Sequence, residues 1–406
     1  MFDKAIFKAL VFLFPTQLAL HFWPSWTHIF GIRVDYLSPT IYLTDVLVGL
    51  LFLFWLKSRP KIPKNVYKWG IGLILFAILN IYFSQSFFPS LIRWIKVFEF
   101  VFLGFYIATK KEFKLKEWII QPLILSVLLF SLIGIIQFLF QRTIGGVFYY
   151  LGERSFNSST PGIALVEIFS RNYLRAYSTF SHPNSMGGYL AVSLLVIAGF
   201  ARKSKVKIIT IFLCCLIIVL SFSLGTYLGL FLAGIIYFFQ KNISKRGIYL
   251  IIAGVLLLSL SLPYLSRGFF MVKFSENLTI MRRLALAEIS QKMIFQRPIL
   301  GVGLNNFVIK LSQQNLYPQV SWWLQPVHNI FLLVFSETGL IGLFLFLFMV
   351  FSAINRSLTI SNRKLIIPII FILVTGALDH YWITLQQNLL LFTLVFGLSF
   401  RRWKNK

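Results

Sequence analysis

Charged residues are scarce in this chain of 406 residues. Asp, Glu, Lys and Arg together make up 13% of it, whereas a soluble domain carries about 25%. Apolar residues take their place: 58% of the chain is hydrophobic, 17% is aromatic, and the mean hydropathy is +0.79. This composition excludes a soluble globular domain and predicts a polytopic membrane protein.

Acidic residues and cysteines are scarcer still. The chain has 12 Asp and Glu against 39 Lys and Arg, which gives a formal charge of +27. The basic residues stand in short clusters between apolar runs, as the positive-inside rule expects, and they form no stripe typical of nucleic acid binding. We therefore expect no nucleic acid partner. The two cysteines, Cys214 and Cys215, are adjacent in an apolar run, so neither a disulfide framework nor a cysteine metal site follows.

Apolar segments long enough to span a bilayer recur along the chain, since a spanning helix needs about 20 apolar residues. We count twelve, near 5–22, 41–56, 69–83, 90–109, 118–140, 184–201, 206–222, 224–240, 248–265, 329–352, 365–380 and 387–400. The pattern predicts an all-α polytopic membrane protein with about 12 transmembrane helices, forming a single integral membrane domain over residues 1–406. We find no small-residue cleavage site after the first segment and interpret it as an uncleaved span.

The loops between these segments alternate in charge. If the N-terminus is cytoplasmic, every second loop carries several lysines and arginines, and so does the C-terminal tail 401–406. This alternation predicts an even number of spans with both termini in the cytoplasm. Two long loops then lie outside, at 141–183 and 266–327, and loops of that length are usually functional or folded. We expect both to pack over the outer membrane surface, partly as short helices, including one from Thr279 to Pro298.

The basic residues of the two outer loops need a separate explanation, because long loops are translocated largely regardless of charge. Arginine holds phosphate with a planar, bidentate fork, and histidine transfers protons near neutral pH. Arg283 and His328, both in or next to the second loop, therefore suit group transfer from a lipid diphosphate. The alternatives are an arginine that reaches toward lipid headgroups and a histidine that only caps the following helix.

Three stretches in this order resemble the O-antigen ligase and polymerase superfamily. They are "STFSHPNSMGGYLAV" (178–192), "MRRLALAEISQKMIFQRPILGVGLNNF" (281–307) and "VHNIFLLVFSETGLIGLFLF" (327–346). The start of the second span, "RVDYLSPTIYLTDVLVG" (33–49), is also similar to that family. Each piece is weak alone, and the ordered set carries the likeness over most of the chain.

The resemblance implies a membrane glycosyltransferase at the outer face of the bacterial inner membrane. Its donor would be a saccharide linked to undecaprenyl diphosphate, and its acceptor a hydroxyl of lipid A core, of a protein or of a growing glycan. The family implies inverting transfer without a metal or another cofactor. By the same resemblance, Arg283 binds the diphosphate and His328 activates the acceptor hydroxyl. Membrane lipids are the remaining expected partner.

One departure from the family bears on the binding of the diphosphate. The family often has a Ser-Arg pair at the start of a span, where this chain has Ser223 and Leu224. A clamp of two arginines then needs another second cation. We expect it from Arg175, just ahead of the "SHPN" segment, or from Arg93 and Lys96, which lie one helical turn apart.

Three more residues are candidates for binding the saccharide or the diphosphate: Arg282, Asn329 and Glu337. For Glu337 we favour an architectural role instead. It precedes Gly339 and Gly342, which predict a break between a short outer helix and the span that follows.

Other polar residues have structural explanations. We expect His182 and Asn184 to cap a helix that Pro183 begins, and Asp379 and His380 to be exposed at an outer helix end. Two intramembrane acids are expected to pair with Arg93 or Lys96: Asp45 and Glu99.

Two other function classes remain open on the sequence alone. Twelve spans also suit a transporter or flippase of lipid-linked saccharides, although such proteins bind near the bilayer midplane. A non-catalytic assembly protein would leave the loop arginines without a role. Within the favoured class, the motifs do not separate a ligase, which attaches a finished glycan, from a polymerase, which extends it.

Overall fold

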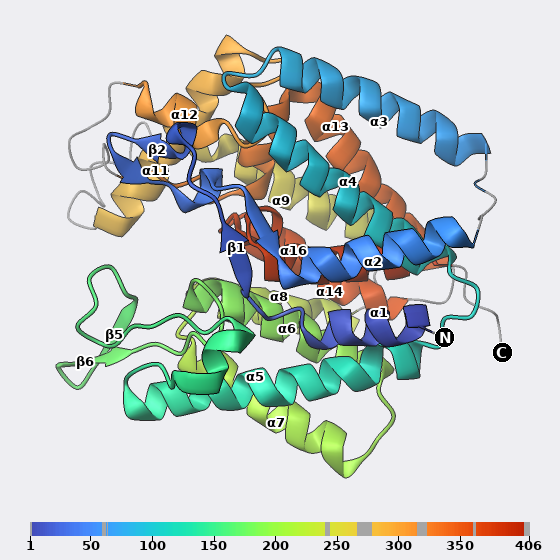
Figure 1. The fold of residues 1–406 in the computed structure, drawn as a ribbon, viewed down its shortest axis with the longest axis vertical. Coiled ribbons are helices and arrows are strands. Elements are labelled where there is room, and N and C mark those ends of the chain that lie inside the picture. Colours follow the sequence, from blue (N-terminus) through green and yellow to red (C-terminus); the bar gives the residue numbers. More distant parts are fainter. Residues whose placement is uncertain are drawn as a thin grey trace.

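The computed structural model describes residues 2–58, 62, 64–239, 244–265, 278–314, 323–359 and 363–401. This part of the chain is mostly helical, and many of its long helices run side by side (Figure 1). Both ends of the chain approach the end of α4 (Phe87–Thr109). There Lys110 pairs with Asp3 at 2.6 Å, and Arg401 donates to the Ile107 carbonyl at 2.8 Å. The start of the first helix and the end of the last helix therefore lie at the same end of the molecule.

Each of the twelve predicted segments contains a helix. Besides α4 these are α1 (Phe2–Phe12), α2 (Leu43–Lys57), α3 (Lys64–Tyr82), α5 (Gln121–Phe140), α6 (Pro183–Phe200), α7 (Lys205–Leu220), α8 (Leu224–Phe239), α9 (Lys245–Leu265), α13 (Ile330–Thr359), α14 (Ile366–Gly376) and α16 (Gln386–Phe400). The helical architecture is confirmed, while the number of membrane crossings stays a prediction.

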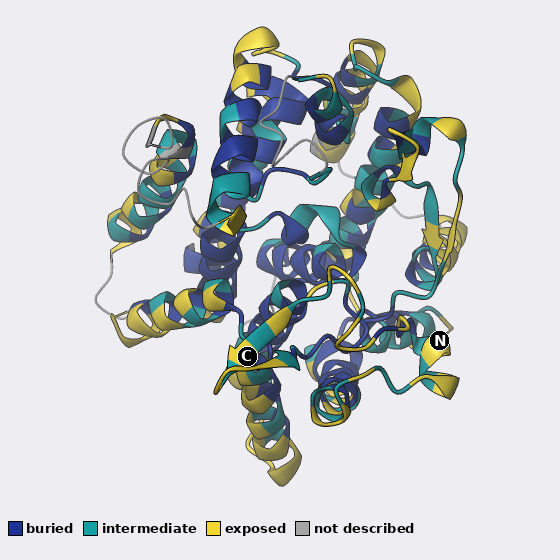
Figure 2. Cartoon of the chain, turned by 90° about the vertical axis from the view of Figure 1, so that its left-hand side faces the viewer, coloured by how far each residue is buried: buried dark blue, intermediate teal, exposed yellow. Residues whose placement is uncertain are grey.

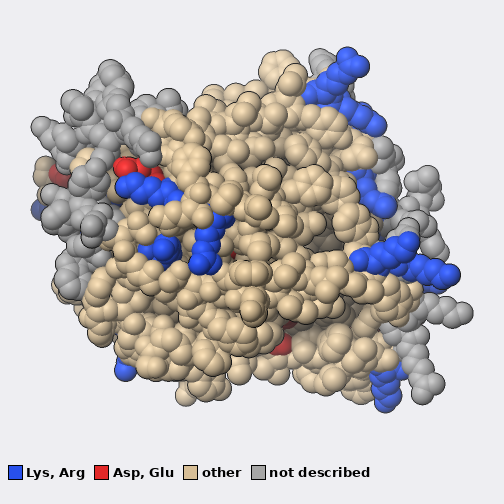
Figure 3. All heavy atoms as spheres, turned by 90° about the horizontal axis from the view of Figure 1, so that it is seen from above, with Lys and Arg blue, Asp and Glu red and all other residues tan. Residues whose placement is uncertain are grey.

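Some helices of the described part are long and apolar enough to cross a membrane. They are the helical stretches Lys116–Phe140, Pro183–Phe200 and Ile330–Leu358, and shorter apolar helices cover Val66–Tyr82, Leu224–Phe239 and Gln386–Phe400. On the face drawn in Figure 3, Lys and Arg lie mainly toward the two ends of the molecule, and a wide surface of other residues separates them. This distribution is typical of a membrane protein, with charged ends and an apolar middle.

The first predicted span, 5–22, is wrong in its second half. Helix α1 ends at Phe12, and the chain continues into strand β1 (Ala19–His21), which pairs antiparallel with β4 (Thr40–Tyr42). Pro15 explains the early end, because proline disfavours helical geometry in the residue before it and donates no backbone hydrogen bond. The segment is apolar enough for a span but lacks a continuous helix.

The first long loop forms a hairpin as well as a short helix. A 3-10 helix covers Gly146–Leu151, and strands β5 (Leu165–Ile168) and β6 (Arg171–Leu174) pair antiparallel. The two turn residues, Phe169 and Ser170, both have positive φ, the geometry that matches the twist of a hairpin. A second small pair, β2 (His28–Ile29) with β3 (Ile32–Arg33), lies near the N-terminus. The strands are local additions to a helical fold that the sequence predicted as all-α.

The second long loop contains the predicted helix. Helix α11 (Leu278–Gln296) matches the expected range 279–298, and α12 (Phe307–Ser312) follows it. Consecutive residues from Leu284 to Ala287 are buried, so α11 is covered on several sides. Trp322, a large aromatic residue of this loop that suits the membrane interface, lies outside the described residues.

The core lies between the helices, and exposed residues lie mainly on their outer faces (Figure 2). Helix α4 packs closely along α16. A Cβ added to Gly397 would stand 3.0 Å from the Gly104 carbonyl oxygen, so glycine permits this approach of two backbones. The pair matters for function because both helices line the large cavity described below.

Helix α13 is broken at Gly339, as the sequence predicted. Gly339 has φ 65° and ψ −166°, outside the helical region. The segment after α11 fills the break: Leu340 N–H donates to the Pro298 carbonyl at 2.8 Å, and Gly303 N–H donates to the Glu337 carbonyl at 3.0 Å. The break therefore anchors the second long loop to the helix bundle.

Replacing Gly339 by alanine should destabilise the protein. Its φ is positive, and an added Cβ would stand 2.2 Å from the Ile299 carbonyl oxygen. We expect a loss above about 2 kcal/mol, seen as a lower melting temperature of the detergent-purified protein. The control is Gly234→Ala in α8, where no described atom lies within 4 Å of an added Cβ. Equal melting temperatures for both variants would contradict this account of the break.

Candidate functional site

Two histidines and an aspartate from separate segments meet beside the start of α13. His328 stands two residues before that helix, and Asp379 and His380 form the turn between α14 and α15 (Tyr381–Thr384). One nitrogen or carboxylate oxygen from each residue lies within 4.8 Å of the other two. The rings of His328 and His380 pack edge to face with centroids 5.1 Å apart.

The interpretation of Asp379 and His380 as exposed residues is wrong. His380 is buried and Asp379 is half-buried. The turn that carries them packs against two other segments, because the His328 ring covers one side of His380 and the Tyr36 ring approaches it to 5.6 Å. In the sequence, exposure at a helix end was a sufficient explanation for these two residues. In the structure they are part of the site.

Asn329 holds His328 against this turn. The Asn329 side-chain oxygen accepts from the N–H groups of Phe331 at 2.9 Å and Leu332 at 3.1 Å, and its amide donates to the Ala377 carbonyl at 3.0 Å. Asparagine is a preferred cap because it satisfies the free N–H groups of a first helical turn. The substrate-binding role given to Asn329 stays a prediction, and in this structure its amide connects α13 to the end of α14.

Arg283 reaches the same turn from α11. Its guanidinium donates to the Leu378 carbonyl at 3.2 Å, directly before Asp379. Helix α11 is fixed to α13 by a bond from the Ser290 hydroxyl to the Leu332 carbonyl at 3.3 Å. The structure therefore brings Arg283 and His328 together, as the sequence predicted, around a carboxylate that the sequence analysis did not assign to the site.

Arg175, in the first long loop, is connected to the site through Asn184. Its guanidinium donates to the Ser221 carbonyl at 2.7 Å and to the Asn184 side-chain oxygen at 2.8 Å. The Asn184 amide in turn lies 3.4 Å from Asp379. Leu224, where the family has an arginine, is 81% exposed. Arg175 thus lies next to the segment that the missing arginine would occupy.

His182 caps α6, as predicted. Its Nδ1 accepts from the Asn184 N–H at 3.1 Å, and the helix begins at Pro183. The cap fixes the turn that presents Asn184 to both Arg175 and Asp379. Its role is therefore structural, while its neighbour Asn184 links the arginine to the carboxylate.

The protonation states of this cluster follow from burial. Burial lowers the pKa of His328 to about 3 against the opposing charge of Asp379. Burial raises the pKa of Asp379, but the charges that His328, His380 and Arg283 can carry outweigh it and lower that pKa to about 2. At neutral pH the site therefore holds a neutral His328 next to an ionised Asp379. A neutral imidazole can accept a proton.

The basic residues of α4 have different surroundings. Lys96 forms an ion pair with Asp45 and lies 3.6 Å from Glu99, so the predicted pairing of the intramembrane acids is confirmed for lysine. The Arg93 guanidinium instead donates to the Ile383 carbonyl in α15. Of the two α4 cations, Arg93 is the one beside the site, and Lys96 is neutralised by acids.

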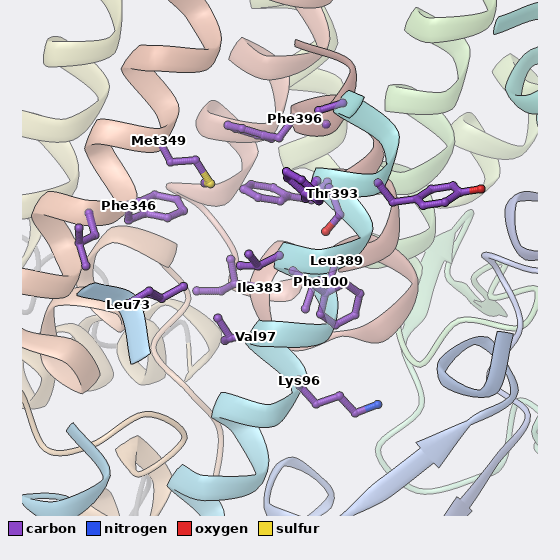
Figure 4. A pocket seen from close by; sticks show the side chains of 18 of the residues that line it. Leu73, Lys96, Val97, Phe100, Phe346, Met349, Ile383, Leu389, Thr393 and Phe396 are labelled. Atoms are coloured by element: carbon purple, nitrogen blue, oxygen red, sulfur yellow. The ribbon is translucent and has the colours of Figure 1, made fainter. Parts of the chain in front are cut away.

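A cavity of about 2040 Å³ opens next to the site. Its apolar lining comes mainly from α3, α4, α13 and α16, and side chains such as Phe346 and Met349 surround it, with Lys96 at one edge (Figure 4). It includes Arg93 near the start of α4 and Lys110 beyond its end, a length of about 25 Å along the helix. Small-molecule pockets rarely exceed about 1,000 Å³, so this space suits a long apolar chain.

The cavity reaches the cluster through two of its lining residues. Tyr36 contacts the His380 ring, and the Thr384 hydroxyl lies 2.8 Å from His380 Nδ1. A ligand with an apolar chain in the cavity can therefore place its polar end beside Arg93 and Thr384, next to His380.

The last two candidates have partners elsewhere. The Arg282 guanidinium lies over the Trp323 ring at 4.1 Å, a cation–π contact. Glu337 is buried and its carboxylate accepts from the Phe307 N–H at 3.0 Å, which supports the architectural role that we favoured. Glu337 also lines the cavity. Substrate binding by either residue stays a prediction.

The chain is similar to known proteins. Residues 208–347, from α7 into α13, match the O-antigen ligase family. A protein named as a candidate polysaccharide ligase from Rickettsia bellii is 25% identical over 328 residues, which is 78% of this chain and 72% of that protein. A similarly named protein from Rickettsia felis is 26% identical over 77% of this chain and 71% of its own length. Another from Rickettsia conorii is 24% identical over 76% of this chain and 72% of its own length. The matched family range contains Arg283 and His328.

Proposed function

Because this membrane protein belongs to the O-antigen ligase family, we propose that it transfers a saccharide from undecaprenyl diphosphate to an acceptor hydroxyl. The acceptor is lipid A core, a protein or a growing glycan, and the reaction takes place at the outer face of the inner membrane. The observation that carries the proposal is the cluster of His328, Asp379 and Arg283 next to a long apolar cavity, which reaches the cluster through its lining residues Tyr36 and Thr384.

The cavity is the binding site for the donor's lipid. Its length and apolar lining suit a polyprenyl chain that enters sideways from the membrane. The diphosphate then lies beside the Asp379 turn, to which the Arg283 guanidinium donates and which Arg175 reaches through Asn184, while Arg93 donates to the nearby Ile383 carbonyl. Guanidinium groups neutralise a leaving diphosphate without a metal, because they form charge-assisted hydrogen bonds to its oxygens.

His328 is the proton acceptor of the reaction. The acceptor hydroxyl oxygen attacks the anomeric carbon, a new glycosidic C–O bond forms, and the bond to the diphosphate oxygen breaks with its electron pair on the leaving diphosphate. The hydroxyl proton passes to His328, which is neutral at neutral pH. Asp379 stabilises the imidazolium that results. A single displacement inverts the configuration at the anomeric carbon.

A transporter of lipid-linked saccharides is the second candidate, and the cavity is the observation that favours it. A reconstituted vesicle assay with a labelled lipid-linked donor separates the two. Transfer to an acceptor supports our proposal, whereas movement of labelled lipid across the bilayer without any glycosidic product contradicts it.

Glycan analysis of a deletion strain separates ligase from polymerase. A polymerase deletion leaves single repeat units attached to their acceptor and removes long chains. A ligase deletion leaves polymer on the lipid carrier with none attached. Both results are compatible with the chemistry above, since the two differ in the acceptor.

Alanine at Arg283 or His328 should abolish transfer. Arg283→Ala removes a charge beside the leaving diphosphate, and His328→Ala removes the proton acceptor, so each should lower product formation by at least about 100-fold. The measurement is a reconstituted assay with purified variants of equal membrane content. Lys292→Ala, on the same helix as Arg283, and the exposed His21→Ala are the controls. Normal product from either active-site variant would falsify the assignment.

Arg175 should behave as the second diphosphate cation. We expect Arg175→Ala to lower kcat/KM for the donor by at least about tenfold, and Arg175→Lys to restore only part of it, because lysine lacks the planar fork. Arg171→Ala, exposed in the same loop, is the matched control. An Arg175→Ala enzyme with unchanged donor kinetics would leave Arg93 as the second cation.

The low pKa of His328 predicts a flat pH profile on the acid side. For an unperturbed imidazole with a pKa near 6.5, the neutral fraction would fall about eightfold between about pH 7 and pH 5.5. His328, with its pKa lowered to about 3, stays neutral over that range, so kcat/KM should fall by less than about twofold. Circular dichroism at each pH checks that the fold is intact. A loss that follows a pKa near 6.5 would contradict the assigned state of His328.

A further inference from the structure

The His328, Asp379 and His380 cluster also has the composition of a metal site. Two imidazoles and one carboxylate offer ligand atoms that all lie within 4.8 Å of one another. From these contacts we propose that the cluster binds one divalent transition-metal ion of the Zn²⁺ type, and that the bound ion reversibly blocks transfer. The blocking part rests on the proposed function, because it requires His328 to be the proton acceptor.

The spacing is close to that of a real site. Zinc binds nitrogen and carboxylate oxygen at about 2.0–2.2 Å in tetrahedral geometry, which puts neighbouring ligand atoms about 3.4 Å apart. The observed limit of 4.8 Å requires a closure of up to about 1.4 Å, which rotations of the side chains can provide. The backbone need not move, because the Asn329–Ala377 hydrogen bond already holds the two segments together.

The ligand atoms are available. His328 Nδ1 is buried and has no hydrogen-bond partner among the described residues, a costly arrangement that a metal bond would relieve. His380 Nδ1 bonds to the Thr384 hydroxyl at 2.8 Å, which orients the ring and leaves Nε2 for a ligand. Metal-binding histidines commonly have a hydrogen-bond partner of this kind on their other nitrogen. The Asn184 amide supports Asp379 in the same way, at 3.4 Å.

The chemistry of the three ligands selects the ion. Two nitrogens and one oxygen suit zinc and its neighbours, whereas Mg²⁺ prefers oxygen ligands alone and near-ideal octahedral geometry. Three protein ligands leave a fourth position open. Arg283 lies beside Asp379 and opposes a cation, so binding must come from the coordinate bonds to nitrogen rather than from charge.

A bound ion would prevent the reaction at a defined atom. Coordination uses the lone pair of a His328 ring nitrogen, and an imidazole that is bonded to metal at that atom cannot accept a proton there. The ion would also neutralise Asp379, which stabilises the imidazolium. Removal of the ion restores both groups, so the block is reversible.

The binding arm of the test needs no activity. The purified full-length protein is stripped with a chelator and titrated with Zn²⁺ by calorimetry. We expect one Zn²⁺ per chain for the wild type, and an affinity at least about tenfold weaker for His380→Gln, which keeps the side-chain volume and a partner for Thr384. The control His21→Ala should match the wild type, and Mg²⁺ should not bind. Absent or unaltered Zn²⁺ binding overturns the site.

If His380→Gln does not fold, Asp379→Asn takes its place in the calorimetric assay only. Asp379→Asn should also bind Zn²⁺ at least about tenfold more weakly than the wild type, because it removes the charged ligand. Binding equal to the wild type would again overturn the site.

The activity arm tests the block. Zn²⁺ should inhibit wild-type transfer and a chelator should restore it. His380→Gln, measured relative to its own rate without Zn²⁺, should resist Zn²⁺ at least about tenfold better. Stimulation by Zn²⁺, or equal inhibition of both proteins, overturns the block. If the protein binds Zn²⁺ through His380 but forms no product in any condition, the proposed transfer fails and the metal site stands. If the protein transfers the saccharide but binds no Zn²⁺, the metal site fails and the proposed transfer stands.

Discussion

The amide of Asn329 is the constraint on which the rest of the site depends. It is fully buried, its oxygen caps α13, and its nitrogen donates to the Ala377 carbonyl. These bonds fix the start of one helix against the end of another, and so set the distance from His328 to Asp379. Aspartate could cap the helix equally well but would lose the donor to Ala377. Asparagine is therefore the side chain that serves both partners at once.

Local features of the sequence were sufficient for the helices, apart from the second half of the first segment, and for the break at Gly339. They were insufficient for Asp379 and His380, because an acid and a histidine at an outer helix end have an adequate local explanation. Only the packing of the turn against His328 and Tyr36 reveals them. The long-range contact leaves no periodic signal in an apolar helix, since almost every face there is hydrophobic.

The choice among the cations could not be made from sequence for a related reason. Arg93 and Lys96 lie one turn apart on α4, so their positions in the sequence do not decide which of them is the second cation. The structure separates them because Asp45 and Glu99 surround the lysine, whereas the arginine donates to a carbonyl of α15. Arg175 reaches the site by way of Asn184, which depends on how the first long loop folds. Ion pairing, rather than position in the chain, decides which charges remain for an anion.

The burial that makes His328 neutral also makes it a weak base in the free protein. A diphosphate between Arg283 and Arg175 would change this, because a nearby negative charge raises the pKa of an imidazole. The histidine would then accept a proton readily only when the donor is bound. An acceptor hydroxyl that arrives first meets a base with a pKa of about 3, whereas one that arrives second meets a stronger base. On the proposed mechanism, the same packing that excludes water from the site thus ties activation of the acceptor to the presence of the donor.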